Sequence, residues 1–348
     1  MTILNTFLNI RYSTRDLSDG DFETIVPNLA AELEKVSFLP TYSDEKLRAD
    51  WKNLKEWVPS EDNLSSTSRV GMKLCEHFCP NFYDIKNSRG VSFTSLWNSK
   101  NLEKILRWNR KCHSTPYLSE IKRGIYFCCG LTKNTMYRPQ LMKLACAKYN
   151  PKIVLDPCAG WGGRMLGAVS NGCDYIAFEP NTTTYSNLQK MVDFLDIGSK
   201  VTLICDDALN MKKYNLPMVD MVLTSPPYFD LEIYADEPTQ SISKTDTYNE
   251  WSEGFLREII KLGVDHLNTG GISCWNVGKV GKNDMNDDVF KYHTELNFTH
   301  IDTLTVTSSK RQSIQSESKN SKSLDNTNVF KKIEAVPVTT SETSTTGN

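Results

Sequence analysis

The sequence lacks any long apolar run. No stretch approaches the roughly 20 consecutive apolar residues that a membrane helix needs, although 39% of the 348 residues are apolar. A signal peptide would be apolar near the N-terminus, where this chain carries Asp16, Asp19 and Asp21. These absences exclude a membrane span. They predict a soluble, intracellular protein with one full α/β domain and an accessory region.

Paired metal-binding cysteines are also absent. The ten cysteines form no CxxC pair, and several, such as Cys146, Cys205 and Cys274, fall in apolar runs. We therefore expect reduced, mostly buried thiols and no metal site. A zinc site is the weaker alternative, in a denser group made of Cys75, His77, Cys79, Cys112, His113, Cys128 and Cys129.

The net charge of −2 hides an uneven distribution. Residues 86–148 carry 13 Lys or Arg against two acids, whereas residues 151–300 carry 12 basic and 21 acidic side chains. Aromatic residues interleave the basic segment, namely Phe93, Trp97, Trp108 and Tyr117. This combination favours nucleic-acid contact over a solvated helical face, which is the alternative.

Apolar spacing divides the chain into regions. Helical spacing of Leu29, Leu33 and Val36, and then of Leu47, Trp51 and Leu54, predicts a mostly helical, basic N-terminal region over residues 1–125. From Pro151 short apolar runs alternate with helical stretches, which predicts a doubly wound parallel sheet in a catalytic domain over 126–333. We expect strands at 153–155, 175–178, 201–204, 219–223, 272–275, 301–306 and 329–333, a helix over 248–267 closed by Gly270 and Gly271, and a disordered tail over 334–348.

A glycine-rich turn follows the first expected strand. The segment LDPCAGWGGRMLGA spans Leu155–Ala168 and opens a helix. Glycines at such a turn let a ligand approach the main chain closely, although a plain strand-to-helix turn has the same composition. The spacing is neither GxGxxG nor GK[ST], which disfavours dinucleotides and triphosphates. We expect cofactor contacts from Asp156, Cys158, Ala159, Gly160 and Gly162.

Acidic residues end the next two expected strands. Glu179 lies 23 positions after Asp156, where a carboxylate can accept both ribose hydroxyls of a nucleoside cofactor. Asp206 and Asp207 end the third strand and are candidates to receive the adenine amine. Either of these two acids could instead cap a helix.

The fourth expected strand ends in LTSPPYFD, Leu223–Asp230. The lone pair of an aromatic amine is delocalised into its ring, so methylating the amine requires acceptors that draw the nitrogen toward a nucleophilic geometry. The Ser225 hydroxyl and the Pro226 carbonyl can accept the two amine hydrogens, Pro227 stiffens the turn, and Tyr228 can stack on a flipped base. Asp230 is one candidate to take up the released proton, and water is the other.

These motifs resemble those of the DNA amino-methyltransferases, in which a glycine-rich cofactor turn precedes a [DNS]PP[YFW] motif. The resemblance covers residues 125–333 and implies a seven-stranded sheet and S-adenosyl-L-methionine as cofactor. The TSPPY form at Thr224–Tyr228 is typical of cytosine N4 methylation, while adenine N6 remains open. Tyr137 and Arg138 resemble the family's motif that touches the methionine part of the cofactor. Cys158 stands where the family usually has Phe.

The resemblance implies direct transfer of a methyl group to a flipped base in DNA, with no metal and no covalent intermediate. The enzyme alternatives are an adenine-N6 enzyme and an RNA or protein amide methyltransferase. A nucleic-acid-binding subunit with an inactive fold is the non-enzymatic alternative. Whether a restriction endonuclease acts as a partner, as in a restriction-modification system, is left open by the sequence.

Overall fold

The computed structural model describes residues 17–60, 68–112, 117–307 and 324–333. Its centre is a seven-stranded sheet of order β3-β2-β1-β4-β5-β9-β8. The first five strands are parallel, and the β8–β9 hairpin closes the sheet with antiparallel pairing of β9 to β5. The strands are β1 (Ile153–Asp156), β2 (Asp174–Phe178), β3 (Val201–Ile204), β4 (Val219–Thr224), β5 (Leu267–Asn276), β8 (Phe298–Thr307) and β9 (Leu324–Lys332).

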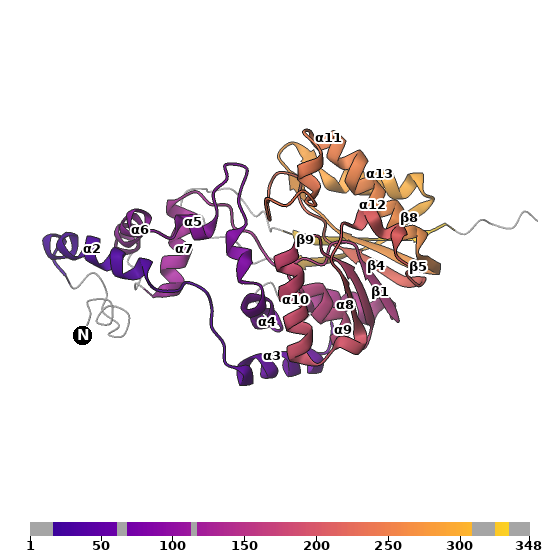
Figure 1. Cartoon of the computed structure of the whole chain (residues 1–348), viewed down its shortest axis with the longest axis horizontal. Coiled ribbons are helices and arrows are strands. Elements are labelled where there is room, and N and C mark those ends of the chain that lie inside the picture. The colour runs from indigo at the N-terminus through magenta and orange to yellow at the C-terminus, as the bar shows by residue number, and fades with distance from the viewer. Residues whose placement is uncertain (1–16, 61–67, 113–116, 308–323, 334–348) are drawn as a thin grey trace, which may run out of the picture.

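Helices cover both faces of this sheet (Figure 1). The face that carries α8, α9 and α10 buries a core that includes Val154, Tyr175 and Leu223, and α11, α12 and α13 cover the other face. The helices on the two faces are α8 (Pro139–Tyr149), α9 (Gly163–Ser170), α10 (Thr182–Leu195), α11 (Tyr248–Trp251), α12 (Arg257–Asp265) and α13 (Met285–Glu295). The predicted doubly wound α/β sheet is therefore confirmed, with all seven expected strands.

The predicted C-terminal end of one helix was wrong. A π turn, Ser252–Leu256, joins α11 to α12, and the helix ends at Asp265. Gly270 and Gly271 lie inside β5, beside the register shift in its pairing with β4 between Val219 and Met221. The pair forms an irregularity in a strand instead of a helix cap, because β5 begins earlier than its apolar residues indicate.

The N-terminal residues divide between two cores. Helices α2, α5, α6 and α7 enclose a separate cluster that includes Phe22, Leu29 and Ile105. Helices α3 and α4 instead pack on α9 and α10, so that Leu47 and Leu54 belong to the core on that face of the sheet. The boundary expected at residue 125 thus does not separate the cores. The N-terminal helices are α2 (Asp19–Glu34), α3 (Asp44–Glu56), α4 (Met72–Phe78), α5 (Phe93–Leu96), α6 (Ser99–Lys111) and α7 (Leu118–Cys128).

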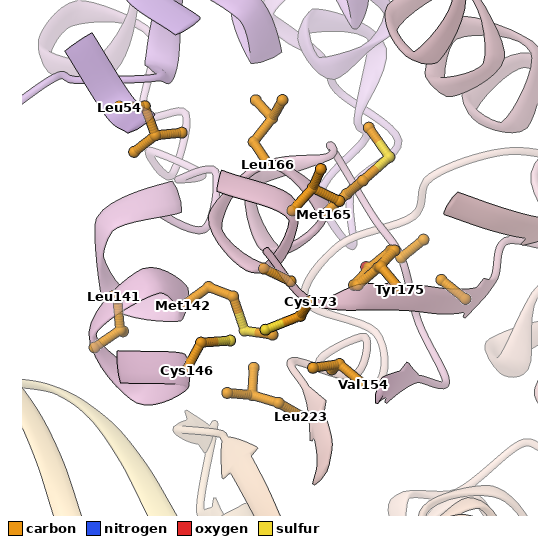
Figure 2. Close-up of a cluster of buried hydrophobic side chains, with 14 of the residues drawn as sticks. Leu54, Leu141, Met142, Cys146, Val154, Met165, Leu166, Cys173, Tyr175 and Leu223 are labelled. Carbon is orange, nitrogen blue, oxygen red and sulfur yellow. The ribbon is translucent and has the colours of Figure 1, made fainter. Parts of the chain in front are cut away.

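Thiols fill part of the core between α8, α9 and the sheet. Figure 2 shows Cys146 and Cys173 among Met142, Val154 and Leu223. All ten cysteines lie in the described ranges and are free, as expected. Cys205 is exposed, so its predicted burial was wrong. Among the described residues no cluster of His, Cys, Asp or Glu could hold a metal ion, and His113 of the weaker zinc alternative lies outside them.

The described helices include none that is both long and apolar enough to cross a membrane. The tail expected over 334–348 lies outside the described residues.

Candidate active site

A cavity of about 530 Å³ lies at the carboxyl ends of the parallel strands. This volume is within the range of small-molecule and cofactor sites, and the carboxyl edge of the strands is where α/β sheets bind ligands. Many of the expected site residues line it, namely Tyr137, Arg138, Cys158, Ala159, Gly160, Glu179, Ser225, Pro226, Pro227 and Tyr228. Asp156, Gly162, Asp206 and Asp207 do not line it.

Asp156 lies beneath the cavity and organises its floor. The carboxylate is fully buried and accepts hydrogen bonds from Arg164 Nε, Tyr175 Oη and Thr224 Oγ1, each at 2.6 Å. It also accepts from the backbone N–H of Cys158 at 3.0 Å. These bonds tie β1, β2, β4 and α9 together. Asp156 thus positions the residues of the cavity floor and does not itself line the cavity.

The glycine-rich turn brings α9 against the segment before α8. A Cβ built on Gly163 would lie 2.0 Å from the carbonyl oxygen of Tyr137, a distance that no side chain can take. Tyr137 and Arg138 can therefore reach the cavity wall only because residue 163 is glycine. Gly162, with φ of +81°, caps α9 and packs against Leu188 instead of facing the cavity.

Glu179 directly follows β2 and presents a buried carboxylate to the cavity. Its oxygens accept from the backbone N–H groups of Gly160 and Asn181, both at 3.0 Å. Desolvation by burial is the main cause that raises the pKa of Glu179 to about 7, against which the two backbone hydrogen bonds act. A ligand hydroxyl that donates to this carboxylate would stabilise its ionised form.

Asp206 and Asp207 have partners inside the protein. Asp207 accepts from the backbone N–H of Leu209 at the start of a short 3-10 helix, Ala208–Lys213, and forms an ion pair with Lys244. Asp206 accepts from Asn210 Nδ2 and Tyr214 Oη, both at 2.8 Å. The capping alternative thus describes Asp207. Neither side chain is placed to receive an adenine amine in the cavity.

Ser225 follows β4 and is oriented by Asn276, at the end of the neighbouring strand β5. Asn276 Nδ2 donates to the Asn326 carbonyl at 3.0 Å and to Thr327 Oγ1 at 3.2 Å. This orientation leaves Asn276 Oδ1 as an acceptor, and the Ser225 hydroxyl donates to it over 3.3 Å. The Ser225 oxygen keeps its lone pairs for another donor. Sequence reasoning missed Asn276 because only strand order brings it beside Ser225.

The rest of the motif shapes the wall next to Ser225. A Cβ on Gly278 would lie 3.1 Å from Cε1 of Tyr228, so the Tyr228 ring packs closely over this glycine. Phe229 has a φ of +43°, a conformation that costs energy for a non-glycine residue and turns the chain sharply away after Tyr228. The Phe229 ring packs on Tyr248 and Trp251.

Two carboxyl groups near the motif differ in position. Asp230 is exposed and does not line the cavity, so it is poorly placed to take up a proton there. Glu232 does line the cavity and accepts a hydrogen bond from Tyr234 Oη. Burial raises the pKa of Glu232.

Burial also raises the pKa of the Cys158 thiol, which therefore stays protonated and is a poor nucleophile.

Comparisons with known proteins bear on the catalytic domain. A family model described as "Conserved hypothetical protein 95" matches residues 135–250, and no curated protein matches the chain. An rRNA methylase from Streptococcus thermophilus is similar in structure at 16% identity, with 58% of this chain and all of that chain covered and a TM-score of 0.37. TrmN from Thermus thermophilus is similar at 15% identity, with 56% and 49% covered and a TM-score of 0.40. A SAM-dependent O-methyltransferase from Thermotoga maritima is similar at 11% identity, with 60% and 71% covered and a TM-score of 0.40.

The strand order, with its closing antiparallel hairpin, decides the fold class. The chain has the class I methyltransferase fold. S-adenosyl-L-methionine is the expected cofactor of this fold. The residues present fit it, because Glu179 offers a buried acceptor for ribose hydroxyls beside the main chain of Gly160. In this methyltransferase fold, Ser225 and Tyr228 line the same cavity as Glu179.

Proposed function

We propose that this chain methylates an exocyclic base amine in DNA, and that the acceptor is N4 of cytosine. The observation that carries the proposal is the orientation of Ser225. Its hydroxyl hydrogen is directed at Asn276 Oδ1, so its oxygen is available as an acceptor at the cavity wall. The TSPPY form of the motif supports cytosine over adenine.

The residues of the motif have complementary tasks in this reaction. Ser225 Oγ and the Pro226 carbonyl accept the two hydrogens of the amine, which concentrates the lone pair on the nitrogen. Tyr228, packed over Gly278, offers a ring face on which the target base stacks. A base in a duplex must leave the helix to enter this cavity, and stacking offsets part of that cost.

Other residues line the half of the cavity in which the cofactor would bind. Glu179 would hold the ribose hydroxyls, the Gly160 turn would lie along the nucleoside, and Tyr137 and Arg138 would lie along the methionine part. When bound, the cofactor supplies a methyl group on a sulfonium centre. The amine nitrogen gains the methyl group and loses one proton, which passes to water or to Glu232 on the cavity wall.

The DNA partner is supported by one surface of the N-terminal helices. Many basic residues of the segment are already paired, including Lys86 with Asp236 and Arg110 with Asp19. Phe93 and Trp97 are buried in the N-terminal core, so these two of the four aromatic residues cannot contact a nucleic acid. Apart from these residues, α6 and α7 carry a stripe of basic and aromatic side chains, in which Arg123 also pairs with Glu120 and Lys104 donates to the Cys128 carbonyl. We define this α6–α7 stripe as Lys100, Lys104, Trp108, Lys111, Arg123 and Phe127.

The centre of the α6–α7 stripe is an aromatic pair. The rings of Trp108 and Phe127 stack with centroids 5.6 Å apart and planes at 12°, and Arg123 lies over Phe127 at 5.3 Å. Phe127 is 55% exposed, so one side of this stacked pair faces solvent. Stacking platforms flanked by cations suit the bases and phosphates of a nucleic-acid strand.

The test is mass spectrometry of nucleosides from unmethylated DNA incubated with the protein and S-adenosyl-L-methionine. We expect N4-methylcytosine with the wild type and a loss of at least about tenfold with Ser225→Ala, because one of two amine acceptors is removed. Ser170→Ala is the matched control. Ser170 is similarly half-buried and makes one hydrogen bond, to the Gly167 carbonyl at 2.8 Å, but lies outside the cavity.

Each other outcome has a defined meaning. N6-methyladenine that depends on Ser225 would retain the mechanism and overturn the cytosine assignment. Methylation of RNA or of a protein amide, with DNA unmodified, would overturn the DNA assignment. Cofactor binding without any methylated product would favour a nucleic-acid-binding subunit.

A further inference from the structure

A segment after the SPPY motif folds back over the cofactor half of the cavity. We call residues 231–247 the strap. Three of its anchors are the following: Ile233 exchanges two backbone hydrogen bonds with Lys86, Glu237 accepts from Thr182 Oγ1 at 2.8 Å, and Lys244 pairs with Asp207. The second and third anchors lie at the start of α10 and just after β3. The strap therefore reaches the ends of β2 and β3, where the nucleoside of the cofactor is expected.

Gln240 of the strap has an unmet polar group beside the cavity. It is only 6% exposed, and it lines the cavity together with Pro180, Ala208 and Phe255. Its side-chain Nε2 is buried and has no hydrogen-bond partner among the described residues. Buried amides are normally satisfied, so an unsatisfied one beside a cavity points to a ligand that completes it. Rotation of the amide can turn either of its ends toward that ligand.

The adenine ring of the cofactor requires what Gln240 offers. Its edge presents an amine donor beside a ring-nitrogen acceptor, and a glutamine amide can match both at once. The acids expected for this task, Asp206 and Asp207, are bound to other groups of the protein and do not line the cavity. The apolar neighbours Pro180, Ala208 and Phe255 would cover the faces of a flat ring.

We propose that Gln240 is the residue that recognises the adenine of S-adenosyl-L-methionine. The strap thus contributes a base-specific contact to the cofactor site. This inference rests on the cofactor of the proposed function and not on the identity of the methyl acceptor. Cofactor binding and DNA methylation can accordingly be tested separately.

The experiment is calorimetric titration of the full chain with S-adenosyl-L-homocysteine and with its inosine analogue. The analogue replaces the adenine amine by a carbonyl and protonates the neighbouring ring nitrogen. We expect the wild type to prefer the adenosine form, and Gln240→Ala to bind it about tenfold more weakly and to lose most of that preference. Gln189→Ala is the control, since Gln189 is a half-buried glutamine on α10 outside the cavity.

A second variant controls for a loss of binding that is caused by misfolding. Gln240→Met keeps most of the side-chain volume but removes both polar ends of the amide without placing a charge in the cavity wall, so we expect it to lose the adenosine preference while the melting temperature stays near that of the wild type. The proposal is overturned if Gln240→Ala retains both the affinity and the adenosine preference of the wild type. Failure of DNA methylation with this binding pattern intact would count against the proposed function alone.

Discussion

At the scale of single residues, Asn276 does no chemistry in the proposed reaction, yet it fixes the direction of the Ser225 hydroxyl. In Asn276→Ala the hydroxyl can rotate and point its hydrogen at the substrate amine. We expect kcat to fall about tenfold with little change in KM for DNA, because the orientation matters most in the transition state. Steady-state kinetics with saturating cofactor measures this split.

A double-mutant cycle provides the control for Asn276. If Asn276 acts through Ser225, then adding Asn276→Ala to Ser225→Ala should cost almost nothing further in kcat. Equal losses in both backgrounds would mean that Asn276 merely supports the local structure through Asn326 and Thr327.

The raised pKa of Glu179 predicts a pH dependence of cofactor affinity. The folded protein holds this proton with a pKa of about 7 instead of the usual 4.5, so the associated stabilisation is present below pH 4.5 and is lost as pH rises through about 7. Ribose hydroxyls that donate to the carboxylate favour the ionised form. The dissociation constant should therefore increase by up to about tenfold per pH unit as pH falls below 7.

Titration calorimetry with S-adenosyl-L-homocysteine between pH 5.5 and about 8 would measure this dependence. Glu179→Gln, which cannot ionise, serves as the comparison and should bind weakly with a flat profile over the same range. An unchanged slope in that variant would assign the pH dependence to another group.

Residue roles were predictable from the sequence only where a local motif carries them. The Ser225–Tyr228 motif and Glu179 follow strands closely, and the structure places them on one cavity. The environment of Asp207 was not predictable, because its partner Lys244 lies 37 positions further along the chain. Asn276 and Gln240 belong to no motif, and only the strand order and the course of the strap bring them to the cavity.

At the scale of elements, the contact between α8 and α9 sets the shape of the cofactor site. A Cβ on Gly167 would lie 2.3 Å from the Pro139 carbonyl oxygen and 2.5 Å from Cβ of Met142. Gly167→Ala should therefore push the two helices apart and destabilise the fold by about 1–3 kcal/mol, despite the higher helix propensity of alanine. Urea denaturation would measure the change.

Gly254→Ala is the matched control for this element. Gly254 is also helical, but a Cβ there meets nothing within 4 Å, so we expect no loss and a gain of up to about 1 kcal/mol. Equal stabilities of the two variants would show that α8 and α9 are not in close contact at Gly167.

The elements themselves could largely be predicted, and their partners could not. Short apolar runs separated by turns identified all seven strands, because strands buried on both faces are continuously apolar. The apolar stripe of α3 predicted a helix correctly but did not reveal that Leu47 and Leu54 pack on the catalytic domain. A stripe indicates that a face is buried without identifying the surface that buries it.

At the scale of the whole molecule, the charge asymmetry of the sequence is only partly an asymmetry of the surface. The ion pair of Lys86 with Asp236 connects the basic segment to the acidic one, and Lys148 pairs with Asp302 on β8. Buried Lys143 donates to the carbonyls of Leu54 and Lys55 at the end of α3. The long-range electrostatic field that the charge count of the sequence suggested is therefore reduced. The α6–α7 stripe carries much of the positive charge that remains on the surface of the basic segment.

The stripe predicts two different effects on DNA affinity, measured by fluorescence anisotropy at several salt concentrations. Lys104→Glu should weaken binding and lower the salt slope by about one, because a phosphate contact and its released counterion are lost. Phe127→Ala should cost about 1–3 kcal/mol for a stacked base and leave the slope unchanged. Lys261→Glu, at an exposed position of α12 outside the stripe, should alter neither. Identical behaviour of Lys104→Glu and Lys261→Glu would mean that net charge, and not this stripe, attracts the DNA.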